Sequence, residues 1–365
     1  MARVIVIGGG YGGVTVAKGL DSVADVVLVE RKDQFVHHAA ALRAAVDEVW
    51  RQTIFMPYSY LLSKGKVVHG TVSRVEGDTV YLYGHEPIKG DYIVFATGST
   101  YPFPAKYISA QSAIAKSRLA DLSESLQHVQ RVLLVGGGTV GLEMAGELLA
   151  AHPGLEVVIV EKEDRILPWP GFTPEFRSSV AEQVSDLGVE VILGAPLAYL
   201  PPTPPGTLGR FQVETTSGVK VEADMWFQCY GARPVTGYLR NTDYAGALTE
   251  DHEIRVLPTM QVAGHPHAYA VGDITDVPES KRADAARNQA RVVIANIASQ
   301  IRGDEPDATY KPRRDIIVLP LGPSRGASQL VDEQGEMRVV GAEETAEIKG
   351  TDLMVSVIRS QLSLP

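Results

Sequence analysis

Two glycine-rich segments of the same design, 128 residues apart, constrain the fold of this chain more than any other feature. In each, four apolar residues lead into three consecutive glycines, and another glycine follows three positions later; the segments are Val4 to Gly13 and Val132 to Gly141. An apolar strand that enters such a loop and leaves it as a helix is typical of a dinucleotide-binding βαβ unit. One loop alone is a weak pattern, but two with matching context predict two dinucleotide sites in one chain.

The residues after each loop complete the same unit twice. We expect a helix over 14–20 and a strand over 25–30 after the first loop. After the second loop we expect a helix over 141–149 and a strand over 157–161. Fully apolar strands fit a parallel sheet that is covered on both faces. The chain is therefore predicted to be an α/β protein with two Rossmann-like domains that arose by internal duplication.

The rest of the chain predicts short strands, one long helix and a small tail. Two segments, 92–98 and 225–231, share a pattern in which a buried strand ends in a small-residue turn. We interpret the proline-dense segment 201–206 as a hairpin tip rather than a linker. The other predicted elements are hairpins at 66–83, a helix at about 281–302, strands at 316–321, 329–331 and 338–341, and a short strand or helix from about 353.

Composition excludes several classes of protein. A net charge of −10 and a pI near 5.4 argue against nucleic acid as a partner, because neutralising phosphates supplies most of the affinity in such complexes. Cys229 is the only cysteine, which excludes an intrachain disulfide and a CxxC redox pair.

The sequence also shows no targeting or membrane-spanning signal. A strand begins by residue 3 with no basic and apolar leader before it, and position 2 is Ala rather than an acylated Gly. No apolar run approaches the ~18 residues of a spanning helix. We therefore expect a soluble, cytoplasmic protein with no transmembrane segment, and peripheral contact with a membrane is left open.

The glycines of both loops stand where a pyrophosphate requires them. Glycine allows the tight turn, the close approach of backbone to phosphate, and the close packing of helix on strand. The helix that starts at each loop points free N–H groups and its positive dipole end at the phosphates. The G-x-G-x-x-G positions are Gly8, Gly10 and Gly13 in the first loop and Gly136, Gly138 and Gly141 in the second.

Each unit also ends on an acid suited to a ribose. Glu30 and Glu161 are placed to accept hydrogen bonds from ribose hydroxyls, and an acid here favours a free 2′-hydroxyl over a 2′-phosphate. NADH is therefore preferred over NADPH at the second loop. Lys162 and Arg165 lie close by in the sequence and partly offset that preference, so use of NADPH stays open.

Further motifs identify a family. The turn at 96–98, its echo at Tyr230-Gly231 and the pair Gly272-Asp273 accompany the two loops. Together they resemble the two-dinucleotide flavoprotein reductases of the FAD/NAD(P)-dependent pyridine nucleotide-disulfide oxidoreductase superfamily. The segment from Phe35 to Val46, with adjacent histidines and an arginine, resembles more specifically the ferroptosis suppressor and apoptosis-inducing-factor-like branch, which is related to type II NADH dehydrogenases.

The resemblance implies a domain order and two cofactors. Residues 1–115 and 245–303 would form a FAD-binding domain, 116–244 an NAD(H)-binding domain inserted in it, and 304–365 a small α+β C-terminal domain. The first loop would bind FAD and the second NADH, with hydride passing from the nicotinamide to the flavin. The protein is thus expected to be a FAD-dependent NAD(P)H oxidoreductase.

The resemblance also assigns residues to the cofactors. Val72 would offer backbone groups to the adenine, Arg43 charge to the pyrophosphate, and Asp273 contacts to the ribityl–pyrophosphate region. A solvated position on a helix explains Arg43 equally well from sequence alone. The expected cofactor-binding residues are Gly8, Gly9, Gly10, Tyr11, Gly12, Gly13, Glu30, Arg31, His38, Arg43, Val72, Ala96, Thr97, Gly98, Gly136, Gly138, Thr139, Val140, Gly141, Glu143, Glu161, Gly231, Gly272 and Asp273.

Electrons must then leave the flavin without an internal thiol relay. Disulfide reductases use a cysteine pair early in the chain, but residues 31–60 contain no cysteine, and we expect Cys229 to be buried. A small, quinone-like acceptor is therefore the leading prediction.

Two side chains of the segment 281–290, which resembles the helix near the flavin ring in this branch, are candidates for the reaction itself. Lys281 is the candidate catalytic residue, because its charge would stabilise an anionic reduced flavin. Gln289 is a candidate donor to a quinone carbonyl. A solvated lysine at a helix start and an ordinary surface glutamine explain the same two residues.

His37 and His38 do not predict a metal site. Adjacent side chains point to different sides of a strand or helix, and no second cluster of His and Cys completes a ligand set. We expect one of the two, His38, to pack beside the flavin, and we assign no metal.

Two other functions stay open. One is a flavin-dependent reductase for a protein or specialised-metabolite acceptor, for which Arg282, Arg287 and Arg291 offer a basic face. The other is a non-catalytic, NAD(H)-responsive regulator, although both loops and both strand-end acids are intact. The tail strands at 316–341 are candidates for a homodimer face or a membrane-facing edge, and the sequence does not choose between them.

Overall fold

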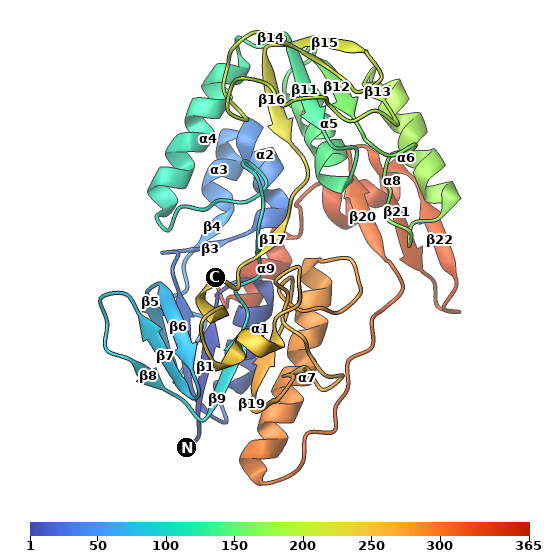
Figure 1. Cartoon of the computed structure of the whole chain (residues 1–365). Coiled ribbons are helices and arrows are strands. Elements are labelled where there is room, and N and C mark those ends of the chain that lie inside the picture. Colours follow the sequence, from blue (N-terminus) through green and yellow to red (C-terminus); the bar gives the residue numbers. More distant parts are fainter.

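The first of two large sheets has six strands in the order β18-β19-β9-β1-β2-β5 (Figure 1). The computed structural model describes all 365 residues. All of its strands except β18 run parallel, as the continuous apolar runs predict. Val4 and Val6 pack toward helices α1 and α7, and Ile5 and Ile7 toward a core on the opposite face. The elements are β1 (Arg3–Ile7), α1 (Tyr11–Leu20), β2 (Asp25–Glu30), β5 (Lys66–His69), β9 (Tyr92–Phe95), β18 (Gln261–Val262), β19 (His265–Ala270) and α7 (Ala283–Arg302).

The second sheet repeats the arrangement with four parallel strands in the order β13-β12-β11-β16. In Figure 1 it forms the upper, largely green and yellow part of the molecule. Thr173 starts α6 by accepting a hydrogen bond from Phe176 N, with a proline at the first helical position. The elements are α4 (Ser112–Leu126), β11 (Arg131–Val135), α5 (Thr139–Ala151), β12 (Glu156–Val160), α6 (Pro174–Asp186), β13 (Glu190–Ile192), β14 (Phe211–Glu214), β15 (Lys220–Ala223) and β16 (Met225–Gln228).

The C-terminal residues form an antiparallel three-stranded sheet that packs against α5 and α6 of the second unit (Figure 1). After this sheet the polypeptide returns to the first unit, where α9 lies against α1: Lys18 Nζ of α1 donates to the Gln361 carbonyl of α9 at 2.8 Å. The elements are β20 (Ile317–Pro320), β21 (Gly326–Val331), β22 (Met337–Val340), α8 (Ala342–Thr345), a π-helical turn at Ala346–Gly350, and α9 (Val355–Gln361).

Shorter elements connect these three parts. The pair β10–β17 matters most, because it crosses between the two large sheets, with Ser99 opposite Pro234. The remaining elements are β3 (Phe35–Val36), α2 (Ala41–Val46), α3 (Glu48–Thr53), β4 (Phe55–Met56), β6 (Val72–Glu76), β7 (Thr79–Leu82), β8 (Ile88–Lys89), β10 (Ser99–Thr100) and β17 (Arg233–Pro234). No helix combines the length and the apolar character needed to cross a membrane.

The structure confirms the α/β fold with parallel sheets, corrects two local predictions and decides one that was left open between a strand and a helix. Residues 66–69 are not part of a hairpin but the edge strand β5 of the first sheet; the hairpin is β6–β7. The segment 201–206 lies in the connection between β13 and β14, while the hairpin tip is at 215–219. The final element near residue 353 is the helix α9. The predicted domain boundaries stay a prediction.

The C-terminal sheet docks on α5 at a position where no side chain fits. A Cβ at Gly146 would lie 2.4–2.5 Å from backbone atoms of Leu321 and Gly322, and Gly322 has φ +76°. Glycine inside a helix is normally destabilising, so its presence here reflects the close approach of the turn after β20.

Gly146→Val is expected to destabilise the protein by about 1–3 kcal/mol, because the turn after β20 must move away from α5. The free energy of unfolding in denaturant, and proteolysis in the connection 303–316, would measure this. Gly246→Ala is the matched control, since its Cβ would meet nothing within 4 Å. Equal stability of the two variants would contradict the tight docking.

Candidate functional site

The first glycine loop has the geometry of a phosphate cradle. Gly8 adopts φ +104°, and a Cβ at Gly13 would lie 1.8 Å from the Gly8 carbonyl oxygen. A Cβ at Gly10, by contrast, would meet nothing within 4 Å. Helix α1 begins directly after Gly10, and no side chain caps it. The loop thus presents open space beside free N–H groups, which suits a bound pyrophosphate.

The second loop repeats this geometry at the start of α5, whose first residues are Thr139 and Val140. Gly136 adopts φ +115°, and a Cβ at Gly141 would lie 2.0 Å from the Gly136 carbonyl oxygen. A Cβ at Gly138 would again meet nothing within 4 Å, and α5 also lacks a side-chain cap. Both loops therefore fit a dinucleotide on the same physical grounds.

The strand-end acids bond to backbone N–H groups of their own loops, and their contact with a ribose stays a prediction. Glu30 is 9% exposed and accepts hydrogen bonds from Gly9 N at 2.5 Å and Lys32 N at 2.8 Å. Glu161 is 5% exposed and accepts from Gly137 N at 2.6 Å and Glu163 N at 3.0 Å. Each carboxylate therefore fixes its loop from behind the central glycine.

A cavity of about 460 Å³ opens beside the first loop, and its lining includes Lys32, Tyr58 and His69. Tyr58 donates to the Gly9 carbonyl at 2.9 Å, and burial lowers the pKa of Lys32 to about 8 despite the opposing charge of Glu30. His69 pairs with Glu30 across the sheet, and Val72 begins the next strand. The placement of the adenine at Val72 stays a prediction.

The turn Gly272-Asp273 lies at the other end of the first loop. Gly272 has φ +83°, and the Asp273 carboxylate accepts from Ser99 Oγ at 2.5 Å and Lys106 Nζ at 2.9 Å. Burial raises the pKa of Asp273, but the Lys106 charge and both hydrogen bonds outweigh it, so the pKa is lowered below its ordinary 3.8. Sequence reasoning missed Lys106, because nothing in the segment 99–111 distinguishes it from a surface lysine.

The turn at 96–98 bonds to Val235, the residue that follows β17 and so lies beyond the second small-residue turn. Gly98 and Gly231 both have positive φ, +65° and +95°. Val235 N donates to the Gly98 carbonyl at 2.9 Å, and Thr97 Oγ1 donates to the Val235 carbonyl at 2.7 Å. A Cβ at Gly8 would lie 2.4 Å from the carbonyl of Ala96, so the first loop also reaches this junction.

The two histidines have different surroundings. Burial lowers the pKa of His37 to about 4, so its ring is neutral at pH 7. His37 Nε2 must donate to the Leu353 carbonyl at 2.6 Å, and Nδ1 then accepts from Tyr11 Oη at 2.9 Å. Burial lowers the pKa of His38 well below 6.5, with the charges of Lys32 and Lys106 acting the same way, and His38 Nε2 has no partner. The structure contains no group of three His, Cys, Asp or Glu residues arranged for a metal.

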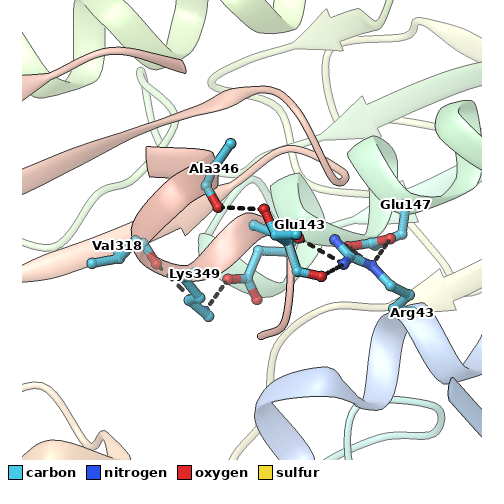
Figure 2. Close-up of polar contacts among 8 residues, drawn as sticks. Arg43, Glu143, Glu147, Val318, Ala346 and Lys349 are labelled. Atoms are coloured by element: carbon cyan, nitrogen blue, oxygen red, sulfur yellow. Dashed lines mark hydrogen bonds and ion pairs between the residues drawn. The ribbon is translucent and has the colours of Figure 1, made fainter. Parts of the chain in front are cut away.

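Arg43 requires a correction. Its side chain is 5% exposed and holds Glu147 of α5 through Nε at 2.9 Å and Nη2 at 2.8 Å, and Nη1 donates to the Gly350 carbonyl at 2.6 Å (Figure 2). The guanidinium therefore joins protein groups of two other units instead of reaching for a pyrophosphate. One turn earlier on α5, Glu143 pairs with Lys349 at 2.8 Å (Figure 2).

The helix segment 281–290 also differs from expectation. Lys281 Nζ is bound by the Thr275 carbonyl, by the Val277 carbonyl at 3.0 Å and by Glu253 at 3.2 Å, so its charge already has partners. Gln289 is 1% exposed and bonds to Gly272 N, so it does not face a substrate pocket. Arg31 forms neither a side-chain hydrogen bond nor an ion pair and stands next to Glu30 at the mouth of the first loop.

Comparison with known proteins agrees with this geometry. Residues 2–290 match the family described as Pyridine nucleotide-disulphide oxidoreductase. The chain belongs to this family. It is similar to Apoptosis-inducing factor homolog B of Dictyostelium discoideum, with 30% identity over 381 residues, 100% of this chain and 97% of the relative. It is also 30% identical over 334 residues to Ferroptosis suppressor protein 1 of Homo sapiens, covering 90% of this chain and 88% of the relative.

Solved structures share the fold. The sulfide:quinone oxidoreductase from Aquifex aeolicus superposes with a TM-score of 0.75 at 17% identity, covering 99% of this chain and 90% of that one. The water-forming NADH oxidase from Lactobacillus brevis bound to NADH gives a TM-score of 0.69 at 18% identity, covering 90% and 75%. This family member is an FAD-dependent NAD(P)H oxidoreductase.

Lys106→Met is expected to make stability depend differently on pH. In the wild type the Asp273 carboxylate contributes stability above its ordinary pKa of 3.8, and this contribution is lost as pH falls through the lowered value. Without Lys106, only the Ser99 hydrogen bond and the Lys281 charge oppose the effect of burial, so the pKa of Asp273 rises from its wild-type value and the contribution shrinks. Denaturant unfolding of the FAD-free proteins should give a lower free energy of unfolding for the variant than for the wild type at neutral pH, and this difference should narrow toward acid pH. A difference in the free energy of unfolding that does not depend on pH would contradict the coupling of Lys106 to Asp273.

Proposed function

We propose that this protein passes hydride from NADH to FAD and then electrons to a small quinone-like acceptor, with FAD at the first loop and NADH at the second. FAD, when bound, supplies the hydride-accepting ring and the electrons for the acceptor. The observation that carries the proposal is the pair of equivalent open loops, at Gly10 and Gly138, on two sheets that the β10–β17 crossing connects.

The chain's own residues would hold and orient the two dinucleotides. The uncapped starts of α1 and α5 offer N–H groups to each pyrophosphate. Asp273, kept ionised by Lys106, would accept hydrogen bonds from the ribityl hydroxyls. Glu30 and Glu161 would accept from the riboses with the carboxylate oxygens that also hold the loops.

The acceptor assignment rests on the surroundings of the one cysteine. Cys229 is 5% exposed beneath the second loop, and burial raises the pKa of its thiol to about 12. A protonated, buried thiol without a second cysteine does not exchange with a disulfide. A small acceptor that takes electrons directly from the flavin therefore fits best.

The loop assignment is tested with matched variants, Gly10→Leu and Gly138→Leu, whose new side chains fill only the open space where phosphate would lie. Gly138→Leu should retain FAD and lose NADH oxidation by 100-fold or more, whereas Gly10→Leu should lose FAD itself. Anaerobic titration with NADH, followed by a soluble short-chain quinone, measures both. Wild-type flavin that bleaches with NADH but is not reoxidised by quinone would contradict the acceptor; loss of FAD from Gly138→Leu alone would reverse the loops.

Glu161 should set the preference for NADH. Glu161→Gln keeps an acceptor for Gly137 N while removing the charge, and Glu161→Arg adds a partner for a 2′-phosphate. The ratio of kcat/KM for NADPH to that for NADH is expected to rise about tenfold in the first variant and further in the second. An unchanged ratio in both would remove Glu161 from the ribose site.

A further inference from the structure

The turn Gly272-Asp273 is held by a series of three hydrogen-bonded side chains, Gln289, Glu279 and Tyr310. Gln289 Oε1 accepts from Gly272 N at 2.7 Å, and Gln289 Nε2 donates to Glu279 Oε1 at 2.7 Å. Tyr310 Oη then donates to Glu279 Oε2 at 2.8 Å. Gln289 is 1% exposed and Tyr310 is 9% exposed, whereas Glu279 between them is half-buried. Neither the glycine loops nor the strand-end acids take part in this chain.

The direction of every hydrogen bond in this chain is fixed by chemistry. An amide N–H of Gly272 can only donate, so the Gln289 oxygen must face it. An ionised carboxylate can only accept, so the Gln289 nitrogen must face Glu279. The two ends of the glutamine side chain are thus not interchangeable. A glutamine that matches a donor on one side and an acceptor on the other is specific to this position.

Other contacts also restrict the backbone of the Gly272-Asp273 turn. The Gly272 carbonyl accepts from Thr275 Oγ1 at 3.0 Å, and a Cβ at Gly272 would lie 3.4 Å from Ala286. On the far side, Asp273 is bound by Ser99 and Lys106. The backbone between these contacts therefore has one arrangement, and the Gly272 N–H is the point where Gln289 sets it.

Tyr310 belongs to the connection between α7 and the C-terminal sheet. Tyr310 N donates to the Pro258 carbonyl at 2.7 Å, and Asn296 of α7 holds the neighbouring Ala308 through its N–H and carbonyl at 2.9 and 2.8 Å. Glu279 thus receives one bond from this connection and one from the side chain that positions Gly272.

We propose that Gln289, Glu279 and Tyr310 are positioning residues for the flavin: they hold the Gly272-Asp273 turn in its cofactor-binding geometry and so set the rate of FAD release and the flavin reduction potential. This inference rests on the proposed assignment of that turn to FAD. It also links cofactor retention to the segment that leads into the C-terminal domain.

A charge-swap series tests the proposal with the intact holoprotein. Gln289→Glu places a second carboxylate directly against that of Glu279 and so breaks the hydrogen bond between the two side chains. The rate of FAD release should therefore rise about tenfold or more, and the reduction potential of the flavin should shift. Adding Glu279→Gln restores an amide opposite a carboxylate with every bond intact, so the double variant should return to within about twofold of wild type.

The matched control is another buried tyrosine, Tyr269 of β19, which bonds to a second glutamine of α7. Tyr269 Oη donates to Gln300 Oε1 at 2.8 Å and does not reach Gly272. Tyr269→Phe should leave FAD release and the flavin potential unchanged, whereas Tyr310→Phe should accelerate release, because it removes one donor from Glu279.

The outcomes separate this inference from the proposed function. Unchanged FAD release in Gln289→Glu, or failure of Glu279→Gln to rescue it, overturns the positioning role. Equal effects of Tyr269→Phe and Tyr310→Phe would overturn it as well, since both would then report general destabilisation. Loss of FAD from Gly138→Leu instead of Gly10→Leu would overturn the loop assignment while leaving the rescue result intact.

Discussion

The buried ion pair between Arg43 and Glu147 is the interaction on which the assembly of the three units depends. Burial raises the pKa of Glu147 although the Arg43 hydrogen bonds and charge oppose it, which shows how strongly the site disfavours an unpaired carboxylate. The Arg43 guanidinium donates a bidentate pair of hydrogen bonds to Glu147 and a third hydrogen bond to the Gly350 carbonyl, so its N–H groups also have partners. Removing one partner of such a pair typically costs about 3–5 kcal/mol, because the other charge stays buried.

Helix α5 contributes residues to the contacts with both of the other units. The second glycine loop leads directly into its first turn, Glu143 and Gly146 contact the C-terminal unit, and Glu147 reaches α2 of the first unit. The two acids are four residues apart and so lie on one face of the helix. A nucleotide at the start of α5 therefore binds to an element that both other units already hold in place, which keeps the loop at a fixed position relative to the first site.

The sequence predicted the loops, the strand-end acids and the parallel sheets because their signals are local. Each loop pattern is only ten residues long, and the backbone conformation at its first glycine, Gly8 or Gly136, excludes other residues. It did not predict Lys106, Lys349 or the true partner of Arg43. Those side chains meet residues 100 to 300 positions away, and nothing beside them in the chain signals the contact. The proline-dense segment was misassigned for a related reason, since proline indicates a turn without saying which strands the turn connects.

The β10–β17 crossing explains why two duplicated units can act as one. Each of its strands follows the strand-end turn of a different sheet, β9 for one and β16 for the other. Ligands of open α/β sheets bind outside the carboxyl ends of the strands, so this crossing brings both binding edges to one junction. Hydride transfer requires the reacting atoms within about 3–3.5 Å, a distance that neither loop sets alone. The bonds from Val235 to Gly98 and from Thr97 to Val235 tie the turn after β9 to the residue that follows β17, and the relative placement of donor and acceptor follows from that short, hydrogen-bonded crossing.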